Sequence, residues 1–264
     1  MIWIVTVGAA YAGITALAWV ATRSVMFPAP TNGREPVMRD ATLLRIPGPE
    51  GTMVYALHAP APAGAPTIVH FHGNGEQLAD VVHLCSRLHA EGVGVFAVEY
   101  PGYGLAASTP ATEANIYAAA DAALVHLGTS LGVSREAIVL SGQSLGSGVA
   151  TEMALRGYGA RLVLLSPYTS MIDMASRIAP FLPARLFVRD RFDNAAKAPR
   201  VRLPVLIVHG SRDEIIPVEQ GRRLSRLFSD ARFEELDDRH HNDLFAEPGA
   251  PLVSRIARFA RGAE

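Results

Sequence analysis

The stretch IVLSGQSLGSG, residues 138–148, decides the expected fold. Its first half is an apolar run typical of a buried strand, and the segment that follows has the composition of a helix. Between them lies Gly-x-Ser-x-Gly around Ser144, a pattern typical of a nucleophile on a sharp strand-to-helix turn. Glycine is needed on both sides because a side chain would meet neighbouring backbone, and the helix N-terminus favours negative charge beside the hydroxyl. We therefore predict that Ser144 is a nucleophile; the alternative is a glycine-rich turn with no catalytic role.

Apolar runs alternate with helix-length segments on both sides of this turn, which indicates an α/β fold. Continuous apolar runs such as VLIV (205–208) are typical of parallel strands buried on both faces. We therefore expect a mostly parallel central sheet of about eight strands, with helices on both faces and the site at the carboxyl ends of the strands. Strands are predicted near 42–47, 53–58, 67–71, 93–99, 137–141, 161–165, 203–209 and 232–236, and helices near 76–91, 112–131, 145–156, 217–228 and 249–261.

A serine nucleophile needs a base, and the base needs an acid that orients it. The segment VLIVHGSRDEIIP (205–217) places Asp213 just after a buried strand, with Glu214 as the alternative acid. Asp213 has a second interpretation, in which it only caps the helix that follows.

The base is expected from LDDRHHNDLF (236–245), which contains His240 and His241. The two histidines are adjacent, so only one of them can face Ser144. The residues alone leave that choice open.

The loop after another predicted strand is the candidate oxyanion hole. In IVHFHGNGEQ (68–77) the glycines let backbone amides approach a substrate oxygen closely. The expected donors are the backbone N–H groups of Asn74 and Leu145. The alternative is a simple turn between a strand and a helix.

The composition excludes several other classes of protein. The chain has 264 residues, of which 49% are hydrophobic, so it is not a disordered chain. A formal net charge of −1 offers no basic field for nucleic acid. Cys85 is the only cysteine, which rules out an intrachain disulfide. His70 and His72 would share a strand face, but no further ligand follows at metal-site spacing, so we predict no metal site.

Several motifs together carry a resemblance to a known family: HGNGE (72–76), VEYPGYG (98–104), SGQSLGSGVA (141–150), SPYTSMIDMA (166–175), PFLPARLFVRDRFDN (180–194), PVLIVHGSRDEIIP (204–217) and HHNDLF (240–245). They cover about residues 66–246 and resemble the α/β-hydrolase superfamily and, within it, the Bem46-like, ABHD13/ABHD17-like group of serine hydrolases. The resemblance implies an α/β-hydrolase fold with a short lid-like excursion within residues 166–203.

The same resemblance implies roles for particular residues. The catalytic histidine of the group directly precedes Asn-Asp, which is His241 here, whereas His240 stands where the group usually has glycine. Tyr103 and Tyr168 lie near the site in this pattern and are expected to wall the substrate pocket. No metal and no organic cofactor is implied.

The N-terminal segment is predicted to be a hydrophobic helix. Residues 2–22 carry no charge, and a helix of this length would span about the thickness of a hydrocarbon core. We expect an anchor over residues 1–23, placing the protein at the inner membrane of a bacterium, on a side that the sequence leaves open. A cleaved signal and a helix that packs on the protein are the alternatives. A linker over 24–39 and a hydrolase domain over 40–264 would follow.

These observations predict a serine hydrolase that cleaves carboxylic esters or thioesters through a covalent acyl-enzyme. Its expected partners are a small-molecule acyl ester or thioester, lipids included, and the membrane. An acyltransferase or a peptidase on the same fold is one alternative, and a non-catalytic membrane-associated binding protein is another. The excursion contributes apolar side chains that would line an acyl pocket, face a membrane or only pack on the domain: Met171, Met174, Ile178, Phe181, Leu182, Leu186 and Phe187.

Overall fold

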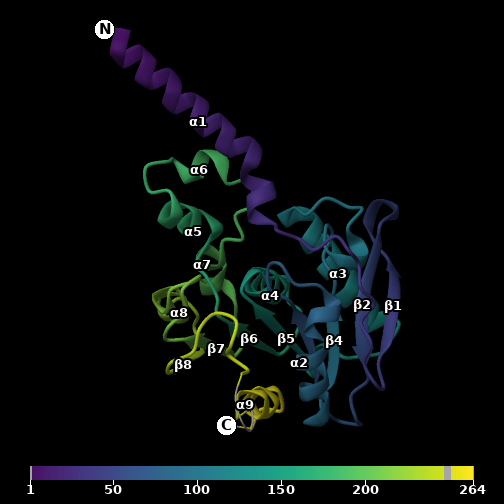
Figure 1. The fold of residues 1–264 in the computed structure, drawn as a ribbon. Coiled ribbons are helices and arrows are strands. Elements are labelled where there is room, and N and C mark those ends of the chain that lie inside the picture. Colours follow the sequence, from purple (N-terminus) through teal and green to yellow (C-terminus); the bar gives the residue numbers. More distant parts are fainter. Residues whose placement is uncertain (1, 247–250, 264) are drawn as a thin grey trace.

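The structure, a computed structural model, describes residues 2–246 and 251–263. Its described strands form one 8-stranded sheet in the order β1-β2-β4-β3-β5-β6-β7-β8 (Figure 1). β2 runs antiparallel to β1 and β4, and the remaining pairs are parallel, which confirms the predicted mostly parallel sheet. The strands are β1 (Thr42–Pro47), β2 (Met53–Ala59), β3 (Thr67–Phe71), β4 (Gly94–Val98), β5 (Ile138–Gln143), β6 (Arg161–Leu165), β7 (Val205–Gly210) and β8 (Ala231–Leu236).

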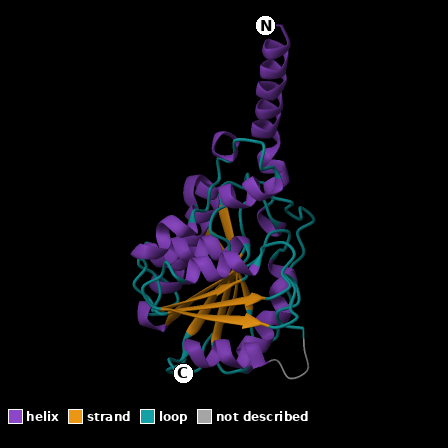
Figure 2. Cartoon of the chain, turned by 90° about the vertical axis from the view of Figure 1, so that its left-hand side faces the viewer, coloured by secondary structure: helices purple, strands orange, loops and turns teal. Residues whose placement is uncertain are grey.

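Helices cover both faces of the sheet (Figure 2). Successive strand residues point to opposite faces, so Val69 and Phe71 of β3 join one core cluster and Ile68 joins the other. The first face is covered by α3, α4 and α8, and the second by α2 and α9. These helices are α2 (Leu78–Ala90), α3 (Glu113–Thr129), α4 (Leu145–Leu155), α8 (Val218–Ser225) and α9 (Pro251–Ala260). Residues 249 and 250 of the predicted last helix lie outside the described residues.

The N-terminal helix α1 spans Ile2–Met26 and stands out from the domain in both views (Figures 1 and 2). A helix was predicted here, and it extends three residues beyond the predicted end. Within residues 2–246 and 251–263, however, no helix has the length and apolar character required to traverse a bilayer. The predicted membrane anchor, and with it the inner-membrane location, is therefore not supported.

The segment after α1 lies against the domain. Phe27 is buried, and its ring centroid is 6.3 Å from that of Phe192. Further along, the N–H of Gly104 donates to the carbonyl of Pro30 at 2.7 Å. The N–H of Arg34 donates to Oε1 of Gln77 at 2.9 Å. These contacts place residues 27–34 beside the loops at the carboxyl ends of the strands, where the candidate site lies.

The excursion between β6 and β7 carries the short helices α5 (Met171–Ile178), α6 (Ala184–Phe187) and α7 (Asn194–Lys197). The hydroxyl of Ser170 caps α5 by accepting the N–H of Asp173 at 3.0 Å. α6 packs against α1, where the buried Phe187 belongs to a small apolar cluster that includes Met26. The excursion thus joins α1 to the rest of the domain.

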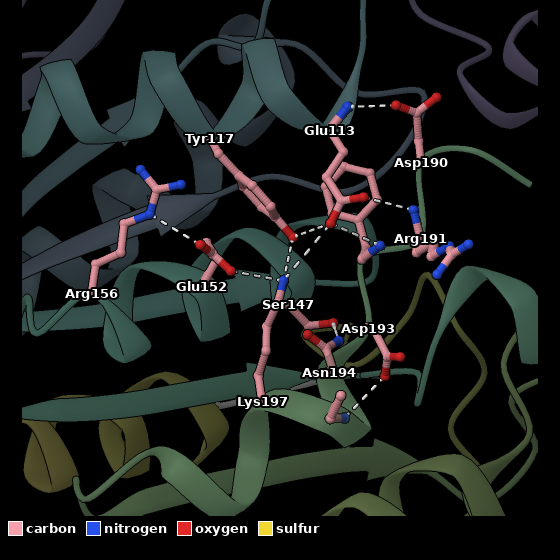
Figure 3. A network of polar contacts seen from close by, with 12 residues as sticks. Glu113, Tyr117, Ser147, Glu152, Arg156, Asp190, Arg191, Asp193, Asn194 and Lys197 are labelled. Carbon is pink, nitrogen blue, oxygen red and sulfur yellow. Dashed lines mark hydrogen bonds and ion pairs between the residues drawn. The ribbon is translucent and has the colours of Figure 1, made fainter.

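A polar network holds the end of this excursion on the domain (Figure 3). Nζ of Lys197, the only lysine, lies 2.9 Å from Oε2 of Glu152 and 2.6 Å from the hydroxyl of Tyr117. Burial alone would raise the pKa of Glu152, but the hydrogen bond and charge of Lys197 lower it below its ordinary value. The carboxylate of Glu113 in turn accepts the backbone N–H groups of Arg191 and Phe192 at 2.6 and 3.1 Å.

We expect Lys197→Met to destabilise the protein by about 2 kcal/mol, because Glu113 loses its cation and Glu152 keeps only the partly exposed Arg156. The free energy of unfolding, from urea titration, measures the effect. Arg45→Met is the matched control, since Arg45 forms an exposed pair with Glu35 at 3.8 Å and its loss should cost within about 0.5 kcal/mol. Equal stabilities of the two variants would contradict this interpretation of the network.

Candidate active site

Ser144 sits on a strained turn between β5 and α4. Its backbone has φ 50° and ψ −115°, in a region that residues with a side chain rarely adopt. The turn is held by its own N–H, which donates to the carbonyl of Leu165 on the neighbouring strand at 2.9 Å. A Cβ atom at Gly142 would lie 2.1 Å from the carbonyl oxygen of Gly146, and one at Gly146 would lie 2.0 Å from that of Phe71. Both glycines are therefore required by backbone atoms that have no room to move.

We expect Gly146→Ala to destabilise the fold by about 3 kcal/mol or more, because the added methyl overlaps backbone of β3. Thermal unfolding of the purified variant, or its loss to the insoluble fraction, measures this. Gly128→Ala is the control: Gly128 lies exposed in α3 with nothing nearer than 3.8 Å, so alanine there should leave stability unchanged or raise it by up to about 1 kcal/mol. A fully stable Gly146→Ala protein would show that the turn is not sterically constrained.

Asp213 and His241 form a buried hydrogen-bonded pair, with 2.7 Å between Oδ2 and Nδ1. A carboxylate only accepts, so Nδ1 carries the proton and Nε2 of the neutral ring keeps its lone pair. Burial alone would raise the pKa of Asp213, but hydrogen bonds from His209 and His241 lower it well below its ordinary value. The acid therefore stays ionised. The other oxygen of Asp213 accepts the N–H groups of Ile215 and Ile216 in the turn before α8. Asp213 therefore does not cap α8 as the alternative interpretation expected, because the N-cap of α8 is Pro217 and has no side-chain cap.

His240 lies on the other side of this turn. Its side chain is 50% exposed, and its Nδ1 lies 3.0 Å from Oε2 of Glu214. Its backbone N–H donates to Oδ1 of Asp243 at 2.6 Å. Of the two adjacent histidines, His241 is the one that contacts the buried acid, and Glu214 is occupied by the other.

Ser144 and His241 line the same cavity, which has a volume of about 340 Å³. Among the described residues, the hydrogen bonds of His241 include none to Ser144. Such contacts are often loose in a protein without substrate and tighten when the substrate binds.

The loop after β3 brings the expected oxyanion donors to the same cavity, which Asn74 and Leu145 line. Their backbone N–H groups make no hydrogen bond within the described part of the chain. The side chain of Asn74 is held at both ends. Its Nδ2 donates to the carbonyl of Met26 at 2.6 Å, and its Oδ1 accepts the hydroxyl of Tyr103 at 2.6 Å. The loop is thus fixed by its side chain, which leaves the amide N–H for a ligand.

A buried ion pair between His72 and Glu99 supports the loop after β3. Nε2 of His72 lies 3.0 Å from Oε1 of Glu99, with both side chains almost fully buried. Burial alone would lower the pKa of His72, but the hydrogen bond and charge of Glu99 raise it above its ordinary value. The hydroxyl of Tyr100 also donates to the carbonyl of His72 at 2.9 Å. His72 therefore holds the backbone from which Asn74 projects.

Comparisons with known proteins show the family to which the chain belongs. A family model described as serine aminopeptidase, S33, matches residues 63–197. An uncharacterized protein of Mycobacterium tuberculosis (strain H37Rv) is 30% identical over 241 residues, which are 91% of this chain and 82% of that protein. The chain therefore belongs to the α/β-hydrolase family that this family model describes. Alpha/beta hydrolase domain-containing protein 17B of Xenopus laevis is 33% identical over 62% of this chain and 55% of that protein, so the match spans about half of that relative.

Solved structures show the same fold. The Pyrococcus furiosus esterase Pf2001 superposes with a TM-score of 0.70 at 16% identity, over 89% of this chain and 98% of that one. A monoacylglycerol lipase of Paleococcus ferrophilus superposes with a TM-score of 0.60 at 23% identity, over 79% and 98% of the two chains. At these identities the likeness concerns the α/β-hydrolase fold alone.

The two predicted pocket tyrosines differ in their placement in this α/β-hydrolase. Tyr168 lines the cavity that Ser144 and His241 share. Tyr103 is buried and contacts the loop after β3 through its hydrogen bond to Asn74, and it is not among the residues that line the cavity. Tyr103 is therefore placed to support the loop.

His209 is a residue at the site that the sequence analysis missed. It is fully buried at the end of β7, and its Nε2 lies 3.2 Å from Oδ2 of Asp213 and 2.8 Å from the carbonyl of Ile216. Both partners are acceptors, so Nε2 carries the proton and shares it between them. Oδ2 of Asp213 thus receives two imidazole N–H groups, one from His209 and one from His241. The signal was the spacing of four residues between His209 and Asp213 across the end of a strand.

His70 at the end of β3 and His72 just after it have separate partners. Nδ1 of His70 lies 3.3 Å from the hydroxyl of Ser141, whereas His72 is paired with Glu99. Burial lowers the pKa of His70 to about 3, so its ring is neutral. Within the described ranges, no group of three or more His, Cys, Asp or Glu side chains is arranged to hold a metal ion.

Proposed function

We propose that this α/β-hydrolase is a serine hydrolase that cleaves carboxylic esters or thioesters through a covalent acyl-enzyme. The observation that carries the proposal is the buried Asp213–His241 hydrogen bond of 2.7 Å, whose imidazole shares a cavity with Ser144 on its strained turn. A depressed pKa on the acid and a free lone pair on Nε2 are what a general base at this position requires.

In the first half-reaction the Oγ of Ser144 attacks the substrate carbonyl carbon while its proton moves to Nε2 of His241. The negative oxygen of the tetrahedral intermediate accepts the N–H groups of Asn74 and Leu145. The intermediate collapses as the carbon–oxygen or carbon–sulfur bond breaks, and His241 returns the proton to the departing alcohol or thiol. Asp213 stays ionised throughout and stabilises the imidazolium through Nδ1.

In the second half-reaction water attacks the acyl-enzyme and gives its proton to His241. The acid is released when the bond to Oγ breaks and the proton returns to Ser144. The positive N-terminal end of α4 and the two amides are aimed at the developing charge before the substrate arrives. Loss of one such donor typically costs about 3 kcal/mol in the transition state.

A serine-directed fluorophosphonate, with intact-mass analysis and peptide mapping, tests the proposal directly. We expect one adduct, on Ser144, together with hydrolysis of p-nitrophenyl acetate. An unlabelled Ser144 in folded protein would contradict it and would favour a non-catalytic binding protein. An aminoacyl p-nitroanilide in the same assay tests for a peptidase, and product analysis with an added alcohol tests for acyl transfer.

A further inference from the structure

A second hollow of about 330 Å³ lies between α1 and the excursion. Residues of α1, α5 and α6 form its walls, among them Ala21, Val25, Ala175, Ile178 and Phe187. The hollow adjoins the catalytic cavity. The residues that line both are Asn74, Met171 and Met174. An apolar space therefore begins where the candidate nucleophile and oxyanion loop are placed.

The chemistry of this hollow favours an alkyl chain. Its lining contains no charged side chain, and its only polar side chains are those of Thr22 and Asn74. The hydroxyl of Thr22 donates to the carbonyl of Ala18 within α1. Asn74 uses its amide on Met26 and its oxygen on Tyr103. With their side-chain polar atoms already hydrogen-bonded, these residues offer little to a polar ligand, and an apolar ligand gains free energy by leaving water.

The wall that α1 contributes is fixed in place. Nε of Arg23 lies 2.8 Å from Oδ2 of Asp190, whose side chain is almost fully buried. The hydroxyl of Tyr11 donates to the carbonyl of Phe181 at 3.1 Å, and the guanidinium of Arg189 lies 4.2 Å from the ring centroid of Trp19. Figure 1 shows α1 running past α6 and α5 in this arrangement.

From these observations we propose that the hollow binds the acyl chain of the substrate, which makes α1 part of the substrate-binding site and a determinant of chain length. The proposal rests on the serine-hydrolase function proposed above. An acyl group bonded to Ser144 extends past Met171 and Met174 into the space beneath α1. The substrates of the protein are then esters or thioesters of medium or long unbranched acyl groups.

The test is the dependence of kcat/KM on chain length for p-nitrophenyl esters from acetyl to dodecanoyl. Each methylene buried in the hollow should raise kcat/KM by up to about four-fold, so the additional methylenes of octanoyl over acetyl contribute at most about 4,000-fold. We expect the octanoyl ester to exceed the acetyl ester by at least about 100-fold, which corresponds to about two-fold per methylene. Ala21→Trp fills the hollow from α1, and we expect it to reduce the octanoyl-to-acetyl ratio at least about ten-fold.

Ala16→Trp is the matched control, because Ala16 is exposed on α1 and does not line the hollow. It should keep the ratio of the natural protein. A second variant, Ile178→Glu, changes an 83% exposed residue of the wall, so folding should tolerate it while the carboxylate disfavours an alkyl chain. It should lower the same ratio.

The outcomes separate this proposal from the function on which it rests. Hydrolysis of the acetyl ester and labelling of Ser144 without any preference for longer chains would overturn the acyl site and leave the hydrolase standing. Equal ratios for Ala21→Trp and Ala16→Trp would also overturn it. A folded protein that hydrolyses no ester and leaves Ser144 unlabelled would overturn the function, and the acyl site with it.

Discussion

Ser144→Ala is expected to lower kcat for p-nitrophenyl esters by about 10⁶-fold, because residues of a triad act as a unit and loss of the nucleophile removes the covalent route. The fold should persist. Alanine has the same Cβ as serine, so the strain at φ 50° is unchanged, and the Ser144 hydroxyl makes no hydrogen bond as donor within the described chain.

Ser147→Ala is the control for this variant. The Ser147 hydroxyl is buried and donates to the carbonyl of Ser144 at 2.6 Å, but it does not line the cavity that Ser144 and His241 share. We expect this variant to be labelled by the fluorophosphonate, whereas Ser144→Ala is not. Labelling of Ser144→Ala at wild-type yield would place the nucleophile elsewhere.

The second large effect distinguishes the adjacent histidines. His241→Ala should lower kcat by about 10⁶-fold, because it removes the only imidazole that links the buried Asp213 to the cavity. His240→Ala should stay within about two-fold of the natural protein, since its half-exposed side chain pairs with the exposed Glu214 and a solvent-screened pair contributes little.

The measurement is kcat on p-nitrophenyl acetate for both variants, with thermal unfolding as the check on folding. Near-natural activity in both would overturn the assignment of the base. A large loss in His240→Ala alone would transfer the role to that ring.

Much of the fold followed from local pattern. The sequence analysis predicted that glycine is required on both sides of Ser144, and the structure gives the same reason. The strand-to-helix turn brings backbone atoms so close to both positions that a side chain does not fit. Continuous apolar runs predicted parallel strands, and β6 and β7 are buried on both faces as those runs require. The N-terminal segment was predicted correctly as a helix, but the anchor inferred from its lack of charge is not supported.

Less of the candidate site could be predicted from local sequence patterns. Adjacent residues on a turn point in different directions, so the chain alone did not separate His240 from His241 except by resemblance. His209 went unnoticed because its contact with Asp213 depends on how β7 ends and the next turn folds back. Tyr103 was expected to wall the pocket, whereas its hydroxyl holds Asn74.

Residue order and periodicity were enough for the mostly parallel α/β sheet, the serine turn and the candidate acid, because short-range sterics and hydrophobic spacing act between neighbours in the chain. Only the tertiary structure showed which imidazole contacts Asp213, what holds the loop after β3, and that a hollow lies beneath α1. They depend on contacts such as Asn74 with Met26 and Arg23 with Asp190, between residues that lie far apart in the chain.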